Sequence, residues 1–535
     1  MPRVRIPIIG GHNKDRSLNI NAQETVNFYP VLGGSGSKTV LALMGTAGLK
    51  DFADLAASIE VRNTLVLGST MYVIAGDTFY SVNTAGAVTT ITAGVLSTTT
   101  GSVYMAHDGA NIMVVDPGVD GYTYNGAGNL TVIADADFPT PSSLTWQDGY
   151  FIVSEESSGK FFISGLYDPT AWDALDYATA EADPDNLKRI FMDNLNLWQF
   201  GGKTTEVGYN SGAADFPFSR YGNLLLNHGT AAPDSVASGD NGLFWLTEKR
   251  QVVRADGFSP VIVSTRQLEH AMAGYSSVSD AKGWCYTLEG HTFYHIVFPA
   301  ANASWEYNVE TKLWHQRRSY PVYADGSERR HRANCYAWFN GKHMVGDYQN
   351  GKIYEWDMDT YTDNSEVIRR YRVTQATHAD GKNIFFHRFD LEMEAGTGLI
   401  SGGTAWAGAT NYALGDRVVP TVANGCVYEV TTDGGSSGAS EPAWPITAGD
   451  TVTDGDLTWT CQGAIPQAVL SWSDDGGHTY GNEHWGGFGA LGQYSVRTFF
   501  NRLGRSRDRR FKISVTGLAK SVILGAFMDL EIGSS

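Results

Sequence analysis

One short pattern in the sequence combines residue types that can organise a tight local structure, at Ser473, Asp475, Gly477, Thr479 and Tyr480. An aspartate that follows a hydroxyl and precedes a glycine can accept backbone N–H hydrogen bonds, while the glycine adopts a conformation that other residues avoid. We therefore expect a β-hairpin turn in which Asp475 is a structural acceptor. Chemistry of this kind stabilises a turn and performs no reaction.

This spacing is that of an Asp-box, a turn found in sialidases, and Arg5-Ile6-Pro7 is similar to an Arg-Ile-Pro motif of those enzymes. A sialidase, however, would show several boxes, one per repeat, with three arginines for the substrate carboxylate and a Tyr and Glu pair. The sequence has one box, lacks GxSxG, HExxH and P-loop motifs, and scatters its 13 histidines. We assign no catalytic residue, and a sialidase-like glycosidase is the least favoured function.

The cysteines indicate neither a metal site nor a cofactor. Cys285, Cys335, Cys426 and Cys461 form no CxxC pair and lie far apart, which excludes the common zinc-finger spacings. Buried free thiols are expected. A disulfide between Cys426 and Cys461 stays open, because both lie in one small segment of a chain that we expect to be made in the cytoplasm.

The composition favours many short strands joined by tight turns. The 535 residues include 61 Gly, 14 Trp, 26 Tyr and 24 Phe, and only 18% are charged. No stretch approaches 18 apolar residues and the N-terminus lacks an apolar signal region, so we expect a soluble protein without membrane insertion. A net charge of −18 disfavours stable DNA binding, which requires Lys and Arg to displace phosphate counterions. Transient passage of double-stranded DNA is compatible with that charge.

A unit of turn, apolar strand, turn and aromatic strand recurs along most of the chain. The steps between successive units are 40, 39, 47, 46, 50 and 50 residues, taking as reference points Met71, Asn111, Tyr150, Leu197, Leu243, Phe293 and His343. Such spacing is typical of four-stranded propeller blades. We predict an all-β fold built on a β-propeller, with six blades preferred and seven possible, because a chain end can supply an outer strand. A pair of β-sandwiches is the alternative.

Two segments interrupt this rhythm and define the predicted domains. Residues 1–60 lack blade-like alternation and are expected to dock, whereas 61–400 form the blades. Residues 401–463 are rich in Gly, Thr and Trp, and the strands on either side of them continue one into the other, which indicates an inserted small β domain. We expect residues 464–535 to supply C-terminal strands that complete the propeller body.

The predicted insert has an aromatic order similar to that of small carbohydrate-binding modules. Its members are Trp406, Tyr412, Tyr428 and Trp444. Aromatic faces can stack on sugar rings, so these residues are glycan-binding candidates. The alternative is that they form the core of the insert, since a domain of roughly 60 residues needs large apolar side chains for stability.

Two basic clusters stand out against the acidic whole. One comprises Arg317, Arg318, Arg329, Arg330, His331 and Arg332, and the other Arg497, Arg502, Arg505, Arg507, Arg509, Arg510 and Lys512. Solvated faces with intersubunit salt bridges are one interpretation. The other is contact with acidic neighbouring subunits, or with DNA at a constriction. The assembly-interface candidates are Arg502, Arg505, Arg507, Arg509 and Arg510.

Several longer motifs, in order, carry a family resemblance. They are STRQLEHAMAGYSSVSDAKG at 264–283, GHTFYHIVFP, WEYNVETKLWHQRRS, GDYQNGKIYEWDMDTYTDN and the stretch from Trp472 to Phe511, preceded by NAQETVNFYPVL and MGTAGLKDF. Together they resemble the tail nozzle proteins of short-tailed bacteriophages, also called packaged-DNA stabilisation proteins. The resemblance covers most of the chain outside 401–463.

The resemblance implies a structural virion protein with a propeller body. Such a protein would form a ring, as a homohexamer, below the portal and its adaptor, retain packaged DNA and let it leave through a central channel. Its further partners would be a tail fibre, tailspike or needle protein, and its location the virion tail, assembled in the host cytoplasm. A host-surface polysaccharide-binding propeller, acting as an adhesin, is the alternative function, with possible contact to host surface glycan.

Overall fold

The computed structural model describes residues 3–56, 58–180, 185–320, 328–395, 404–422, 424, 426–432, 434–446, 449–464, 467–489 and 494–533. Strands dominate these ranges. Their one α-helix is α1 (Arg266–Ala273), and a single 3-10 turn, η1, spans Pro233–Ser235. Thr265 caps α1 by accepting a hydrogen bond from the Leu268 backbone N–H. Within the described residues, no helix has the length and apolar character needed to cross a membrane.

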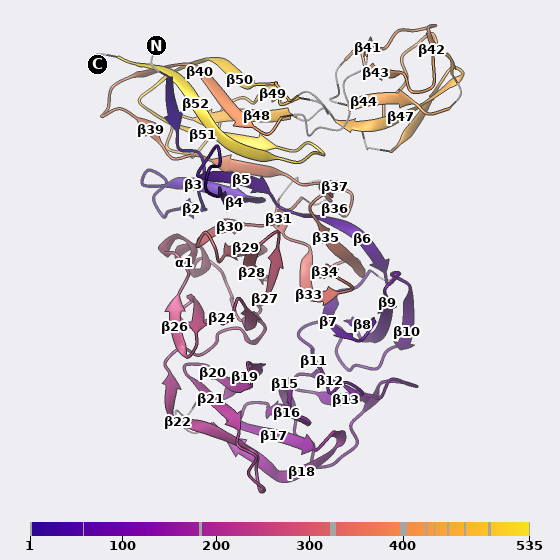
Figure 1. Ribbon diagram of the computed structural model, residues 1–535, viewed down its shortest axis with the longest axis vertical. Coiled ribbons are helices and arrows are strands. Elements are labelled where there is room, and N and C mark those ends of the chain that lie inside the picture. The colour runs from indigo at the N-terminus through magenta and orange to yellow at the C-terminus, as the bar shows by residue number, and fades with distance from the viewer. Residues whose placement is uncertain are drawn as a thin grey trace.

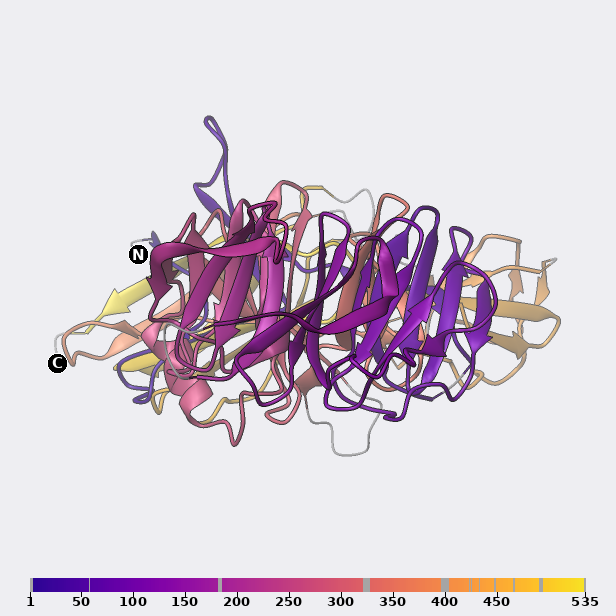
Figure 2. The same ribbon diagram turned by 90° about the horizontal axis from the view of Figure 1, so that it is seen from below.

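Seven four-stranded units form a ring in the described part of the chain, which confirms the predicted β-propeller (Figure 1). Blades 1 to 3 are β7 (Val61–Leu67), β8 (Thr70–Ala75), β9 (Thr78–Asn83), β10 (Val88–Thr92); β11 (Tyr104–His107), β12 (Ile112–Asp116), β13 (Asp120–Tyr124), β14 (Thr131–Val132); and β15 (Pro141–Gln147), β16 (Tyr150–Glu155), β17 (Lys160–Gly165), β18 (Asp168–Thr179). Seen from below, their strands run between two faces made of turns (Figure 2).

Blades 4 to 7 continue the ring. They are β19 (Leu187–Asp193), β20 (Asn196–Gly201), β21 (Thr205–Asn210), β22 (Phe218–Leu226); β23 (Ala237–Gly239), β24 (Gly242–Leu246), β25 (Val252–Asp256), β26 (Ser259–Ile262); β27 (Lys282–Leu288), β28 (His291–Phe298), β29 (Ala303–Asn308), β30 (Leu313–Gln316); and β33 (Ala333–Phe339), β34 (Lys342–Asp347), β35 (Lys352–Asp357), β6 (Gly48–Asp54).

An N-terminal strand closes the ring. β6 pairs antiparallel with β35 and so becomes the outermost strand of blade 7, although it lies in the segment predicted to dock. Each neighbouring pair of blades shares an apolar cluster, and the last of these joins Phe339 of blade 7 to Val61 of blade 1. The preferred count of six blades is therefore wrong and the alternative of seven holds, because the N-terminal strand completes a unit that sequence spacing leaves one strand short.

A β-sandwich forms a second body from both ends of the chain (Figure 1). One sheet contains β4 (Phe28–Leu32), β5 (Leu41–Gly45), β52 (Val522–Ile532), β40 (Ile384–Met393), β50 (Thr498–Ser506) and β1 (Arg3–Ile6). The other contains β3 (Ala22–Val26), β38 (Arg370–Val373), β51 (Asp508–Val515), β48 (Gln467–Ser473) and β49 (His484–Gly487), with β2 (Asn13–Lys14) and β39 (Thr377–His378) at its sides.

The sandwich has its own core, in which Phe389 and Met528 of one sheet pack with Leu470 and Phe511 of the other. The prediction that residues 464–535 complete the propeller body is therefore wrong. Alternating apolar residues identify these segments as strands but do not identify which sheet they join. A single parallel bridge, from Val26 to Gln316, connects the second sheet to blade 6.

The insert leaves the sandwich between β40 and β48 (Figure 1). It contains β41 (Thr404–Ala405), β42 (Asn411–Tyr412), β43 (Arg417–Val419), β44 (Cys426–Val430), β45 (Gly435–Ser436), β46 (Thr451–Asp454) and β47 (Leu457–Ala464). The predicted boundary at residue 400 lies outside the described residues. Four short strands complete the chain, namely β31 (Arg318–Ser319), β32 (Arg329–Arg330), β36 (Thr362–Asp363) and β37 (Glu366–Val367).

Candidate assembly site

The predicted aspartate turn follows β48 in the sandwich. The Asp475 carboxylate accepts hydrogen bonds from the Thr479 backbone N–H at 3.0 Å, the Thr479 hydroxyl at 2.6 Å and the Ser473 hydroxyl at 2.6 Å. Gly477 has φ +94°, a conformation that favours glycine. The hydroxyl groups of Ser473 and Thr479, with backbone N–H groups, hold the pKa of the Asp475 carboxyl well below its usual range. All of these hydrogen bonds to the Asp475 carboxylate come from residues of the turn, so they stabilise the turn itself.

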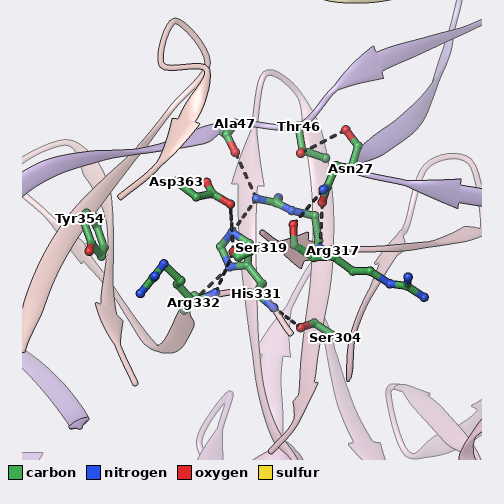
Figure 3. A network of polar contacts seen from close by, with 12 residues as sticks. Asn27, Thr46, Ala47, Ser304, Arg317, Ser319, His331, Arg332, Tyr354 and Asp363 are labelled. Carbon is green, nitrogen blue, oxygen red and sulfur yellow. Dashed lines mark hydrogen bonds and ion pairs between the residues drawn. The ribbon is translucent and has the colours of Figure 1, made fainter. Parts of the chain in front are cut away.

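The first basic cluster lies at the junction of the propeller and the sandwich (Figure 3). Arg317 follows β30 of blade 6, and its Nη2 donates to the Ala47 carbonyl at 3.1 Å, on the segment that connects the sandwich to β6. The same Nη2 lies 3.0 Å from Nε2 of His331. Arg317 is 2% exposed and His331 is fully buried. The cluster therefore joins blade 6, blade 7 and the segment of Thr46 and Ala47 between β5 and β6, which we call the crossing segment.

Glu306 balances this buried charge from β29. Its carboxylate lies 3.6 Å from Nη1 of Arg317, 3.0 Å from Nδ1 of His295 and 2.6 Å from Nε2 of His315, and it accepts from the Tyr286 hydroxyl at 2.5 Å. Burial opposes ionisation, but Arg317 and the two imidazoles hold the pKa of Glu306 well below its usual range. Burial lowers the pKa of His295. The centre is a buried ion pair of Glu306 and Arg317, with the rings of Tyr286, His295 and His315 around the carboxylate.

A second buried carboxylate, that of Asp363, lies 3.9 Å from Nε2 of His331. Ser319 donates to the Asp363 carboxylate at 3.0 Å, and Arg370 donates to the Thr46 carbonyl at 3.1 Å. Burial raises the pKa of Asp363 and lowers that of Arg370 to about 10. Burial and the charge of Arg317 keep the pKa of His331 well below its usual range. The imidazole of His331 is therefore neutral and adds no charge next to the Arg317 guanidinium.

Asn27 locks the crossing segment to both bodies (Figure 3). Its amide nitrogen donates to the carbonyls of Arg318 and Arg369, each at 2.8 Å, and its amide oxygen accepts from the Arg318 N–H at 2.9 Å. Its carbonyl accepts from the Thr46 N–H at 3.1 Å, and its φ of +53° lies in the left-handed region. Sequence reasoning missed Asn27, although asparagine is among the residues that tolerate such a φ.

Neither sequence interpretation of the first cluster holds for its buried members. Arg317, Arg330, His331 and Arg332 are internal, so they form no solvated face and reach neither neighbouring subunits nor DNA. Arg332 donates to Asp347 at 3.0 Å, and the Arg330 guanidinium stacks on the Tyr348 ring at 3.8 Å. The sequence signal was present, because Trp and Tyr residues surround this cluster in the chain. Aromatic faces and carboxylates supply the partners that buried arginines need.

The second cluster divides into internal and external residues. Arg509 is 2% exposed and donates to both Asp474 carboxylate oxygens, at 2.6 and 2.7 Å, while it packs on the Phe386 and Trp472 rings. Arg510 is 1% exposed and donates to the Leu18 carbonyl at 3.1 Å. The prediction of both as assembly-interface residues is wrong, because other parts of the chain cover each guanidinium group, on opposite faces of β51.

The other three interface candidates, Arg502, Arg505 and Arg507, are exposed. β50 carries the first two and is an edge strand, since within the described ranges it pairs with β40 alone. Arg507 lies in the turn into β51. Arg502 has φ +60° beside a register shift, so a bulge interrupts the edge and turns it away from simple strand pairing. No ion pair to these three guanidinium groups occurs among the described residues, which leaves them available as an external basic row.

The aromatic residues of the insert mainly form its core. Tyr428 is fully buried, and Trp406 is 9% exposed, with its indole N–H donating to Asp454 at 2.8 Å. The glycan-binding prediction is therefore wrong for these two, because a small domain uses its largest rings for packing. Tyr412 and Trp444 are half-buried against the same core. For them glycan binding stays a prediction.

The cysteines and Arg5, which the sequence also offered as candidates, do not come together in a site among the described residues. All four cysteines are free thiols, and Cys426 and Cys461 share the core of the insert without a disulfide. Arg5 lies on β1 of the sandwich, where its guanidinium donates to the Thr39 hydroxyl at 3.1 Å. Among the described residues no group of three His, Cys, Asp or Glu side chains could hold a metal ion.

Comparison with known proteins agrees with the two bodies of the fold. A family profile described as bacteriophage P22 Gp10, beta-propeller, matches residues 4–361, and one described as bacteriophage P22 Gp10, beta-sandwich, matches residues 449–531. No curated protein matches. Similar solved structures include the computationally designed Ika8 protein, with 8% identity over 58% of this chain and 99% of that chain and a TM-score of 0.35. The WD40 beta propeller domain of Doa1 has 11% identity over 58% and 96%, with a TM-score of 0.37.

Proposed function

The chain belongs to the bacteriophage P22 Gp10 family of tail nozzle proteins, which stabilise packaged DNA, and from this premise we propose that it assembles as a closed homohexameric ring below the portal and its adaptor. The observation that carries this proposal is the paired family match, first to the propeller and then to the sandwich. The ring would retain the genome and provide the channel for its ejection. It would act in the virion tail after assembly in the host cytoplasm.

The buried junction supports a structural role. Arg317 and Asn27 tie the propeller to the N-terminal segments by hydrogen bonds, and Glu306 forms a buried ion pair with Arg317 inside blade 6. A subunit joined in this way can transmit load between neighbouring tail proteins without changing shape. We propose that the protein has no catalytic activity of its own, since the buried cluster around Glu306 and Arg317 is closed to solvent and its charged groups pair with one another.

The exposed basic row supports a specific mode of assembly. In a protein of net charge −18, Arg502, Arg505 and Arg507 form a local positive surface that an acidic neighbour can contact. The neighbour would be the adaptor, a second copy of this chain, or a tail fibre, tailspike or needle protein. Double-stranded DNA would pass through the channel without stable binding, because an acidic protein repels its backbone.

Electron microscopy of the purified full-length protein, alone and with the portal and adaptor of the same virion, tests the ring. We expect a six-fold particle with a central channel wide enough for a DNA duplex. A monomer that ignores both partners but binds host cells would overturn the nozzle assembly and favour the adhesin alternative.

A charge-removal variant tests the basic row. Replacing Arg502, Arg505 and Arg507 with Ala changes the net charge from −18 to −21, which is −18 minus 3. The matched control replaces Lys188, Lys249 and Lys312, three exposed cations of the propeller. We expect the arginine variant alone to lose ring or adaptor association at about 0.1 M salt, where surface charges still interact. Equal assembly of both variants at low salt would refute the role of the row.

A further inference from the structure

A polar cleft opens between blades 2 and 3 on one face of the propeller. It lies where the β11–β12 and β13–β14 turns of blade 2 meet the β17–β18 turn of blade 3, and its volume is about 490 Å³. This volume is in the range that small-molecule sites occupy. Its polar and aromatic lining comes from Asn111, Thr123, Asn125, Asn129, Thr131, Tyr167, Asp168 and Thr170.

The chemistry of this lining restricts the ligand. Amides and hydroxyls can both donate and accept hydrogen bonds, and three asparagines and three threonines supply them here. No Lys or Arg lines the cleft, so phosphate groups and nucleic acid would find no counter-charge. Its apolar surface is small, so it offers little to the anchor residues of a protein partner. An uncharged ligand rich in hydroxyl groups satisfies such a surface.

Tyr167 adds an aromatic platform at the edge of the cleft. Its side chain is 62% exposed and its backbone has φ +56°, in the left-handed region that a bulky residue rarely adopts. The Tyr167 N–H donates to the Gly149 carbonyl at 2.7 Å. A Cβ at position 149 would approach the Tyr167 ring to 3.1 Å, so glycine there lets the ring lie close to the backbone. The strained turn thus holds an exposed ring in place.

The neighbouring loops hold polar side chains in place and leave some of their hydrogen-bonding atoms available. Thr170 donates its N–H and its hydroxyl to Oδ1 of Asp168, at 2.9 and 2.6 Å, which leaves Oδ2 as an acceptor. In blade 2, Asn125 and Asn129 flank a turn in which Gly126 and Gly128 have φ +85° and +73°. Asn125 accepts from the Ala127 N–H at 3.2 Å, so its amide nitrogen is directed to other partners.

From this cleft we infer that the propeller binds an uncharged saccharide of the host surface between blades 2 and 3. The sugar ring stacks on Tyr167, while its hydroxyl groups donate to Asp168 and bond the amides of Asn125 and Asn129. This site is separate from the aromatic core of the insert. Its residues belong to the propeller, whereas the basic row belongs to the sandwich.

A microarray of purified bacterial O-polysaccharides and capsular polysaccharides, incubated with the labelled full-length protein, tests this inference. We expect retention of at least one uncharged polysaccharide, with less than a twofold change between 0.1 and 0.5 M NaCl because no ion pair is involved. Absence of retention of any printed polysaccharide would overturn the inference, as would retention of acidic polysaccharides alone.

Two substitutions at one position separate binding from folding. Tyr167→Asn removes the ring, and asparagine tolerates the left-handed φ, whereas Tyr167→Phe keeps the ring. We expect at least a tenfold loss of retention for Tyr167→Asn and little change for Tyr167→Phe. Leu175→Ala is the matched control, because Leu175 is 82% exposed on the same strand, β18, but does not line the cleft.

The remaining outcomes also decide the question. Asn129→Ala should weaken retention without moving the urea midpoint of unfolding, since Asn129 is exposed. Equal retention by the wild type, Tyr167→Asn and Asn129→Ala would overturn the proposed cleft. Loss of retention in Trp444→Ala but not in Tyr167→Asn would place glycan binding in the insert instead. Capture of another tail protein through Tyr167, without any polysaccharide, would likewise overturn it.

Discussion

The two arginine-rich regions look alike in the sequence but differ in the folded chain. Around the propeller–sandwich junction, Arg317 and Arg332 are buried with carboxylate partners, so their charge is internal. Along β50 and the turn that follows it, Arg502, Arg505 and Arg507 face solvent. The partners around a cation, more than its local sequence, therefore decide whether it stabilises the fold or is available to another molecule.

Removal of the central junction carboxylate should have the largest effect. Glu306→Gln leaves the Arg317 charge buried without its partner, so we expect a loss of about 3–5 kcal/mol in the free energy of unfolding. Urea denaturation of the full-length protein measures it. Glu355→Gln is the control, because Glu355 pairs with the partly exposed Lys342 at 2.7 Å and should cost about 1 kcal/mol or less. Similar losses for both variants would erase the distinction.

The contrast can also be tested across the turn that joins β50 to β51. Arg509→Ala removes two hydrogen bonds to Asp474 and the packing on Trp472, and should cost about 1.5–3 kcal/mol. Arg505→Ala, four residues earlier, should change stability by less than about 0.5 kcal/mol. Comparison of their urea midpoints checks the assignment of one residue to the interior and the other to the surface. A larger cost for Arg505→Ala would reverse that assignment.

Acid should weaken the junction through His331. Its folded-state pKa is lowered, so as the pH falls below about 6.5 the unfolded chain binds the proton first and stability decreases. The stability continues to decrease until the pH reaches the folded-state pKa of His331. Each pH unit costs up to about 1.4 kcal/mol, or about 2 kcal/mol between pH 6.5 and 5. His331→Gln should show a shallower pH dependence of its urea midpoint; an unchanged slope would assign the acid sensitivity to other groups.

The smallest expected effect extends the comparison to aromatic residues. Trp444 is half-buried and packs against Tyr428, with ring centroids 4.3 Å apart. We expect Trp444→Ala to weaken the insert by about 1–2 kcal/mol, since an aromatic pair and part of a buried ring are lost. Hydrogen exchange of β44 and β47 in the full-length chain measures this loss. Unchanged protection would mean that Trp444 is free for a ligand.

Much of the fold could be predicted from local sequence patterns. The spacing of turns and aromatic strands from Met71 to His343 predicted the propeller, because a blade is built from strands adjacent in sequence. The turn around Asp475 is likewise a contact among neighbours. The resemblance of the longer motifs predicted the family. The candidate site was less accessible, since Asn27 and Glu306 carry no signature beyond a turn-tolerant amide and one carboxylate among many.

The β-propeller, its family and the structural use of Asp475 could therefore be predicted before the fold was known, because each depends on residues that are close in sequence. The folded chain was needed to identify the seventh blade, which requires β6 from the N-terminal region, and the sandwich, which combines strands from both ends of the chain. It also decided that Arg510 is internal, through a hydrogen bond to Leu18 across nearly the whole chain. Burial is set by segments that meet in space, so alternation along a strand cannot specify which neighbour covers it.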